Sequence, residues 1–229
     1  MKIENNYLLL DDYFKVKKIT ATSFYGLLGG NKFKPKGDYL LGVFNLLKEP
    51  FDPFYTKRGE IAETIANNHL KSRGYKTKTW NKFDIGFDNF KNLVEFGGMI
   101  DIAITEPERM LYEIKSKNIK DIDKIKRFPN LEQEHQALFY AYHSKCPNVR
   151  ILYVFFTDEQ EQRIRNDLLL DIENEKFEFY EKDLILDNQD IEQKLETALS
   201  YKKKCLEERR IPLADISQKA LGLMGITKN

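Results

Sequence analysis

Apolar positions follow two different spacings along this chain, and the spacings predict both helices and strands. In residues 58–73 apolar side chains recur at three- and four-residue intervals, as on one face of an α-helix. Residues 39–47 and 131–144 also have helical character, and prolines follow both segments. We expect a short helix with a hydroxyl cap at residues 22–28, before two glycines, and a longer helix near residues 190–209.

Strand-type patterns lie between these helices. Residues 99–104 and 110–115 alternate with a period of two, and residues 75–83 alternate more weakly. Residues 151–156 are continuously apolar, as expected of a strand in a sheet covered on both sides. A further strand is expected at residues 176–180. The order of elements predicts an α/β fold with a mixed central sheet flanked by helices.

Composition supports a folded chain of 229 residues that is 41% hydrophobic, with 16 Phe and 12 Tyr for a core. No apolar run approaches the ~20 residues of a membrane span, and residues 1–12 lack the pattern of a secretory signal. The two cysteines, Cys146 and Cys205, are too few for an iron–sulfur cluster and suit a reduced intracellular setting. We therefore expect no membrane partner and no such cluster.

The formal net charge of +1 conceals a division along the chain. Residues 158–196 contain 14 acidic and five basic residues, whereas the rest of the chain contains 22 acidic and 32 basic residues. Residues 13–37 alone contain six lysines and no acidic residue. Segregated positive charge keeps nucleic acid among the candidate partners, although both charged regions could also be solvated faces.

The candidate chemistry centres on Asp101, Glu113 and Lys115. The 12-residue interval between the two acids suits adjacent strands joined by a tight turn. Glu113 and Lys115 then share one strand face, on which Asp101 can converge. Carboxylates are suitable ligands for Mg²⁺ or Mn²⁺, and a lysine can stabilise hydroxide or charge on phosphorus. The pattern alone is weak, because charged residues alternate on many exposed strands.

Neighbouring helices strengthen the pattern. In the helix predicted at residues 58–73, Glu63 lies on the stripe directed toward the protein body, whereas Glu60 lies on the polar stripe. A slip of one residue would exchange the two acids, so Glu60 stays open as an alternative ligand. Gln136 and Tyr140 are four residues apart and therefore lie on one helix face.

Together these segments resemble the PD-(D/E)xK nuclease superfamily and, within it, the phage lambda exonuclease and related phage-type recombination exonucleases. They occur in the family's order and span roughly residues 14 to 160. The superfamily's proline is absent, since Met99 and Ile100 precede Asp101. The resemblance implies a restriction-endonuclease-like core, and it is carried by residues 19–24, 58–63, 98–101, 113–115 and 136–140.

The resemblance also implies roles for individual residues. Lys115 corresponds to the catalytic lysine. Gln136 and Tyr140 match the element that supports the site and the DNA strand. The metal ligands would be Glu63, Asp101, Glu113 and the backbone carbonyl of Ile114.

A second set of residues corresponds to the family's site for a terminal 5′-phosphate. Thr22 stands where the family has the hydroxyl, and Ser23 beside it leaves that assignment open by one position. Lys15 stands where the family has an arginine, so a point charge replaces a bidentate fork.

The resulting prediction is a Mg²⁺-dependent deoxyribonuclease, with Mn²⁺ as a substitute, that acts as a 5′→3′ double-strand DNA exonuclease in phage-type recombination and repair. By resemblance its partners are duplex DNA with a free end, further copies in a ring trimer, and a single-strand annealing protein. The expected location is the cytoplasm of a bacterial host or phage-infected cell. We expect one nuclease domain over residues 1–229, with DNA-end-binding helices in 1–57, a catalytic core in 58–157 and an acidic C-terminal extension in 158–229.

Other functions are compatible with the same fold, because a fold does not fix polarity or substrate. Within the superfamily they are a RecB-like nuclease module, a restriction endonuclease and a junction resolvase. From a different class, a noncatalytic DNA-binding protein could retain the fold. The intact set of Asp101, Glu113 and Lys115 argues against that last alternative.

Overall fold

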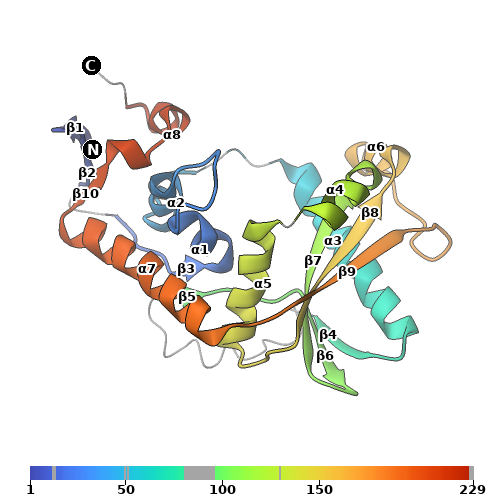
Figure 1. Cartoon of the computed structure of the whole chain (residues 1–229). Helices are drawn as coiled ribbons and strands as arrows, with labels where there is room; N and C mark the ends of the chain where they lie inside the picture. The colour runs from blue at the N-terminus through green and yellow to red at the C-terminus, as the bar shows by residue number, and fades with distance from the viewer. Residues whose placement is uncertain (12–13, 49, 51, 80–95, 129, 227–229) are drawn as a thin grey trace. The chain divides into compact units, whose positions relative to one another are not determined.

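In the computed structural model the chain forms two compact units (Figure 1). The first is drawn from Met1–Pro50, Phe90–Gly98 and Asp187–Asn229, and the second from Phe51–Asn89 and Met99–Leu186. The division of one nuclease domain at residues 57 and 157 stays a prediction. The structure describes residues 1–11, 14–48, 50, 52–79, 96–128 and 130–226.

The second unit is built on a five-stranded mixed sheet, as the sequence predicts. Only the two central strands, β7 and β8, run parallel, and every other neighbouring pair is antiparallel. The alternating segment at residues 110–115 and the apolar run at residues 151–156 form these central strands. In sheet order the strands are β4 (Lys76–Thr79), β6 (Ile102–Glu106), β7 (Met110–Asn118), β8 (Val149–Phe156) and β9 (Glu178–Leu184).

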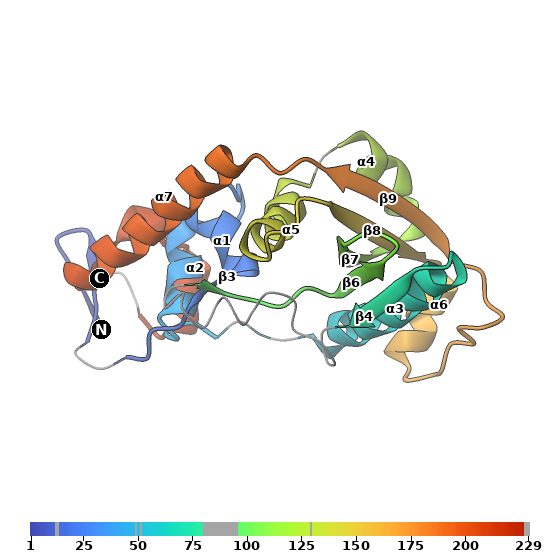
Figure 2. The same cartoon turned by 90° about the horizontal axis from the view of Figure 1, so that it is seen from below.

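Helices cover both faces of this sheet. On one face, α3 (Pro53–Ser72) packs its apolar stripe against Tyr112 and Ile114 of β7. On the other face, α5 (Leu131–His143) packs against β7 and β8 (Figures 1 and 2). Because side chains alternate along β7, Glu113 and Lys115 lie on the α5 face. This confirms the α/β class with a mixed sheet flanked by helices.

The first turn of α3 lies earlier than the sequence pattern predicts. Asp52 caps the helix by accepting a hydrogen bond from the backbone N–H of Phe54, and Pro53 occupies the first turn, where its missing N–H has no cost. The proline expected to end the preceding segment therefore begins α3.

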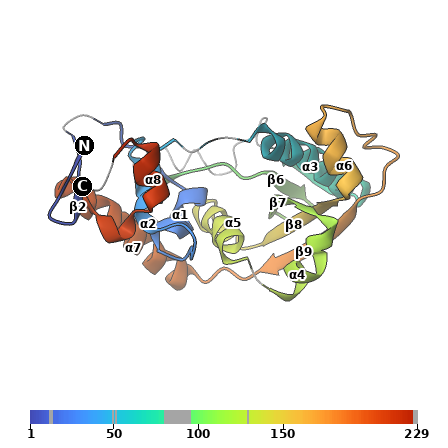
Figure 3. The same cartoon turned by 90° about the horizontal axis from the view of Figure 1, so that it is seen from above.

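Within the described part of the second unit there are also three shorter helical elements, of which α6 packs beside α3 (Figure 3). They are η2 (Ile119–Asp121), α4 (Ile122–Arg127) and α6 (Asp158–Arg165).

The acidic segment is part of the second unit's structure up to residue 186. Its strand β9 pairs with β8 from Val149 to Phe155, which is seven of the eight residues of β8. Its carboxylates also pair with basic side chains of the preceding core. These ion pairs are Glu161 with Arg58, Glu181 with Arg73 and Arg150, and Asp183 with Arg150.

The first unit contains both described ends of the chain (Figure 1). A small antiparallel sheet joins β1 (Lys2–Glu4), β2 (Tyr7–Leu9) and β10 (Arg210–Pro212), and β3 (Ile19–Thr20) pairs in parallel with β5 (Phe96–Gly97). Its helical elements are α1 (Ala21–Leu27), α2 (Lys36–Val43), α7 (Asn188–Glu207), η3 (Leu213–Asp215) and α8 (Gln218–Leu223). None of the helices in the described ranges is both long and apolar enough to cross a membrane.

Candidate active site

Asp101 lies immediately before β6 and is tied to the neighbouring strand. Its Oδ2 accepts a hydrogen bond from the backbone N–H of Ile114 at 2.7 Å. The turn between β6 and β7 thus folds as the interval between Asp101 and Glu113 predicts. This bond places the Asp101 carboxylate beside the part of β7 that carries Glu113 and Lys115.

Lys115 is fixed by two oxygen atoms from two different elements. Its Nζ donates to Oε1 of Glu113 at 2.5 Å and to Oε1 of Gln136 on α5 at 3.0 Å. Glu113 is 1% exposed, and the Lys115 side chain is 19% exposed. The lysine ammonium is therefore held in one position with limited access to water.

The second carboxylate oxygen of Glu113 is unusual. Oε2 is buried and has no hydrogen-bond partner, and an unsatisfied buried charged group carries a large desolvation penalty. Burial raises the pKa of Glu113 even though Lys115 is beside it. Burial also raises the pKa of Asp101 well above its usual value, and the nearby charges of Glu113 and Glu63 add to this increase. Lys115 supplies one positive charge to this pair of carboxylates, and burial outweighs its effect on both pKa values.

Gln136 and Tyr140 lie on the face of α5 that is directed at this cluster. Tyr140 is buried, and its hydroxyl contacts the Gln136 side chain and the backbone of Met99. Burial, followed by the charge of Glu113, raises the pKa of Tyr140. Tyr140 therefore stays a neutral phenol, and its contacts orient Gln136 toward Lys115.

Glu63 is close to the cluster without completing it. It is half-buried on α3, whereas Glu60 is exposed, in agreement with the stripes read from the sequence. Its charge acts on Asp101. Within the described ranges, however, no three histidine, cysteine, aspartate or glutamate side chains form a group suited to a metal ion. Asp101 and Glu113 offer carboxylate oxygens to a cation, and the roles of Glu63 and of the Ile114 carbonyl as further ligands stay predictions.

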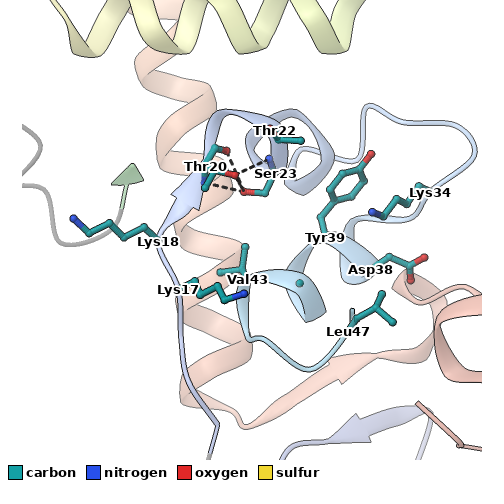
Figure 4. A pocket seen from close by; sticks show the side chains of 11 residues that line it. Lys17, Lys18, Thr20, Thr22, Ser23, Lys34, Asp38, Tyr39, Val43 and Leu47 are labelled. Atoms are coloured by element: carbon teal, nitrogen blue, oxygen red, sulfur yellow. Dashed lines mark hydrogen bonds between the residues drawn. The ribbon is translucent and has the colours of Figure 1, made fainter. Parts of the chain in front are cut away.

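A separate cavity of about 370 Å³ lies within the first unit, around the start of α1 (Figure 4). Thr22 and Ser23 both line it. The lysines that line it are Lys17, Lys18 and Lys34, and the Lys17 side chain extends toward the cavity in Figure 4. Lys15, which the resemblance selects, is exposed and is not among the lining residues. The acid-free run of lysines in residues 13–37 indicated a basic site in this segment. It did not indicate which of these lysines line the cavity.

The hydroxyl of Ser23 is used by the helix itself. Thr20 is the N-cap of α1, and Ser23 forms a capping box with it. The Ser23 hydroxyl donates to the Thr20 carbonyl at 3.0 Å and accepts from the Thr20 backbone N–H at 2.9 Å. This geometry favours Thr22 over Ser23 as the donor to a bound anion.

Comparison with known proteins gives a match in fold and none in sequence. No family model and no curated protein matches the chain. An alkaline exonuclease, LHK-Exo, from Laribacter hongkongensis is similar in structure, with a TM-score of 0.57 and 15% identity over 84% of this chain and 89% of that chain. The same protein in complex with dAMP gives a TM-score of 0.56 and 16% identity, over 83% and 90% of the two chains.

A phage-related exonuclease from Haemophilus somnus 129PT is also similar. It gives a TM-score of 0.54 and 16% identity over 86% of this chain and 97% of that chain. The chain therefore has the fold of these exonuclease structures, as the resemblance implies.

Proposed function

We propose that this protein is a Mg²⁺-dependent deoxyribonuclease that degrades double-stranded DNA from a free end, in the 5′→3′ direction. The observation that carries the proposal is the pair of the half-buried Asp101 and the buried Glu113 beside a fixed Lys115. The alkaline exonuclease and the phage-related exonuclease that share this fold support this choice among hydrolytic reactions.

The donor set fits a hard divalent cation. Glu113 Oε2 has no hydrogen-bond partner, and burial disfavours charge on both carboxylates, so a cation would relieve both problems. Asp101, Glu113 and the carbonyl of Ile114 would hold Mg²⁺, or Mn²⁺ in its place, with Glu63 as a further ligand. The bound ion would polarise the scissile phosphate and lower the pKa of the attacking water.

The side chains of the protein supply the remaining functions. Lys115 places a positive charge beside the carboxylates, where it stabilises the attacking oxygen and charge that develops on phosphorus. Gln136 keeps the lysine in place through the 3.0 Å hydrogen bond to its ammonium. Tyr140, as a neutral phenol, keeps Gln136 oriented.

The cavity in the first unit is suited to a terminal phosphate. Thr22, Lys17 and Lys34 are among its lining residues, and the carboxylate of the lining residue Asp38 accepts hydrogen bonds from Ser217. Such a site would bind the phosphate of a 5′-phosphorylated end and would thereby favour attack from a free end. In a phage-type recombination pathway the product would be a single strand for an annealing protein.

The decisive experiment compares three DNA substrates in Mg²⁺ and in EDTA. They are linear duplex with a 5′-phosphate, linear duplex with a 5′-hydroxyl, and covalently closed circular duplex. We expect fastest nucleotide release from the phosphorylated end, no cutting of circles, and no reaction in EDTA. Cutting of circles would instead indicate an endonuclease of the same fold, and binding without cleavage in Mg²⁺ or Mn²⁺ would indicate a noncatalytic protein.

A further inference from the structure

Strand β7 continues past the candidate site with another basic residue on the same face. Because alternate side chains share a face, Glu113, Lys115 and Lys117 form one row. Lys117 lies opposite Phe155 in the parallel register with β8, as Lys115 lies opposite Tyr153. Two residues of strand advance the chain by about 7 Å. That separation resembles the distance between neighbouring phosphates along one DNA strand.

Unlike Lys115 and Arg58, Lys117 has no counterion among the described residues. Lys115 pairs with Glu113, and Arg58 pairs with Glu161. Among the described residues, the ammonium group of Lys117 forms neither a hydrogen bond nor an ion pair, although the residue is half-buried.

The surroundings of Lys117 are electrostatically positive. Burial, followed by the charge of Arg58, lowers the pKa of Lys117, and Lys115 and Lys124 act in the same direction. Asp121 opposes this effect without reversing it. A half-buried ammonium group among like charges is unfavourable unless an anion joins it. The positive charge at the end of β7 therefore favours the binding of a negatively charged group.

We propose that Lys117 binds the phosphodiester next to the scissile one, on its inward side in the duplex, and that Lys124 of α4 supports this contact. The inference rests on the proposed nuclease function and adds a binding residue that the resemblance does not include. The contact with Lys117 is distinct from the proposed site of the 5′-terminal phosphate, which is the cavity of the first unit. Lys117 would therefore align the cleaved strand along β7.

The first test compares Lys117→Ala and Lys117→Arg with the wild type on linear duplex DNA. We expect Lys117→Ala to raise KM about tenfold with kcat nearly unchanged, since one charge-assisted contact is lost. The slope of log affinity against log salt should fall by about one. Lys117→Arg should restore binding. Lys176→Ala is a matched control, because Lys176 is an exposed lysine of the same unit, and it should behave as the wild type.

The second test locates the contact with a single neutral methylphosphonate in the cleaved strand. Release of the first nucleotide is measured with the neutral linkage at each of the first few inward positions. The wild type should lose about tenfold when the first linkage beyond the scissile one is neutral, whereas Lys117→Ala should show no further loss there. Equal sensitivity of both proteins at every position would overturn the inference, as would retention of wild-type KM by a folded Lys117→Ala.

The two proposals fail in different ways. If the wild type cleaves no DNA in Mg²⁺ or Mn²⁺, the proposed function and the inference both fall. If the wild type cleaves and Lys117→Ala matches it, only the inference falls. Weaker binding of inorganic phosphate by the variant, with unchanged DNA binding, would show a site for free anions and would also overturn the inference.

Discussion

The backbone N–H of Ile114 donates a 2.7 Å hydrogen bond to Oδ2 of Asp101, so a side chain ahead of β6 is fastened to the middle of β7. The bond has a structural consequence and a chemical one. It fixes how the two strands meet, and it holds the half-buried carboxylate of Asp101 beside Glu113, whose charge makes that carboxylate harder to ionise.

Substitutions at Asp101 should separate these two consequences. Asp101→Asn keeps an acceptor oxygen for Ile114 but removes the negative charge, so we expect a fold at least as stable as the wild type and no DNA cleavage. Asp101→Ala leaves the buried N–H of Ile114 unsatisfied and should lower the free energy of unfolding by about 1–2 kcal/mol. Urea unfolding and a nuclease assay measure both effects, and wild-type cleavage by Asp101→Asn would refute the site.

Lys115 and Gln136 should differ in the size of their effect on turnover. Lys115→Ala removes the positive charge and should lower kcat at least about a hundredfold, with DNA binding retained. Gln136→Ala removes only one of the two oxygens that hold the lysine, so kcat should fall by about tenfold. Single-turnover cleavage and binding to uncleaved DNA in Ca²⁺ provide the measurements. Undiminished turnover in Lys115→Ala would exclude its proposed role.

Arg58 should contribute to stability. Its side chain, 11% exposed, pairs with Glu161 and donates to the Ser116 hydroxyl and carbonyl. Arg58→Ala leaves the half-buried Glu161 without its ion-pair partner, so the free energy of unfolding should fall by about 2–3 kcal/mol. Arg210→Ala is the control, because its pair with Glu208 is exposed and should contribute less than about 1 kcal/mol. Equal effects of the two variants would contradict the assignment.

His143 should make stability depend on pH. Burial lowers its pKa to about 4 in the folded protein, against about 6.5 in the unfolded chain. Between these values the unfolded chain binds a proton and the folded protein does not, so the free energy of unfolding falls as the pH falls from 6.5 toward 4. The free energy of unfolding has its full value above pH 6.5, and it is lower by about 3 kcal/mol at pH 4.

The control for this prediction is His143→Phe, which keeps an aromatic ring next to Phe139. Urea unfolding at pH 7 and pH 4.5 should show a smaller difference for the variant than for the wild type. Part of the difference should persist, because burial also lowers the pKa of His69, which stacks on Phe179. An unchanged pH dependence in the variant would show that His143 is not responsible.

Local patterns in the sequence were sufficient to predict the two parallel strands of the sheet. Alternation at residues 110–115 correctly predicted that Glu113 and Lys115 share a face, and the apolar run at residues 151–156 correctly predicted a covered strand. Both signals depend only on spacing and burial, which the sequence contains directly.

Features that depend on long-range partners could not be predicted. A proline fits either the end of one helix or the first turn of the next, and only the cap at Asp52 decides for Pro53. Which lysines line the cavity depends on how the segment before α1 runs, so Lys17 and Lys18 could not be preferred over Lys15. The unpaired state of Lys117 is likewise visible only once Arg58 and Lys115 have their own partners.

The pairing of β9 with β8 has a consequence for shortened forms of the chain. Seven of the eight residues of β8 are buried, and β9 covers its outer edge. A protein that ends near residue 157 would present β8 as a bare apolar edge strand, which is a template for pairing with other chains. Such a fragment should aggregate, whereas one that ends after residue 186 retains the closing strand.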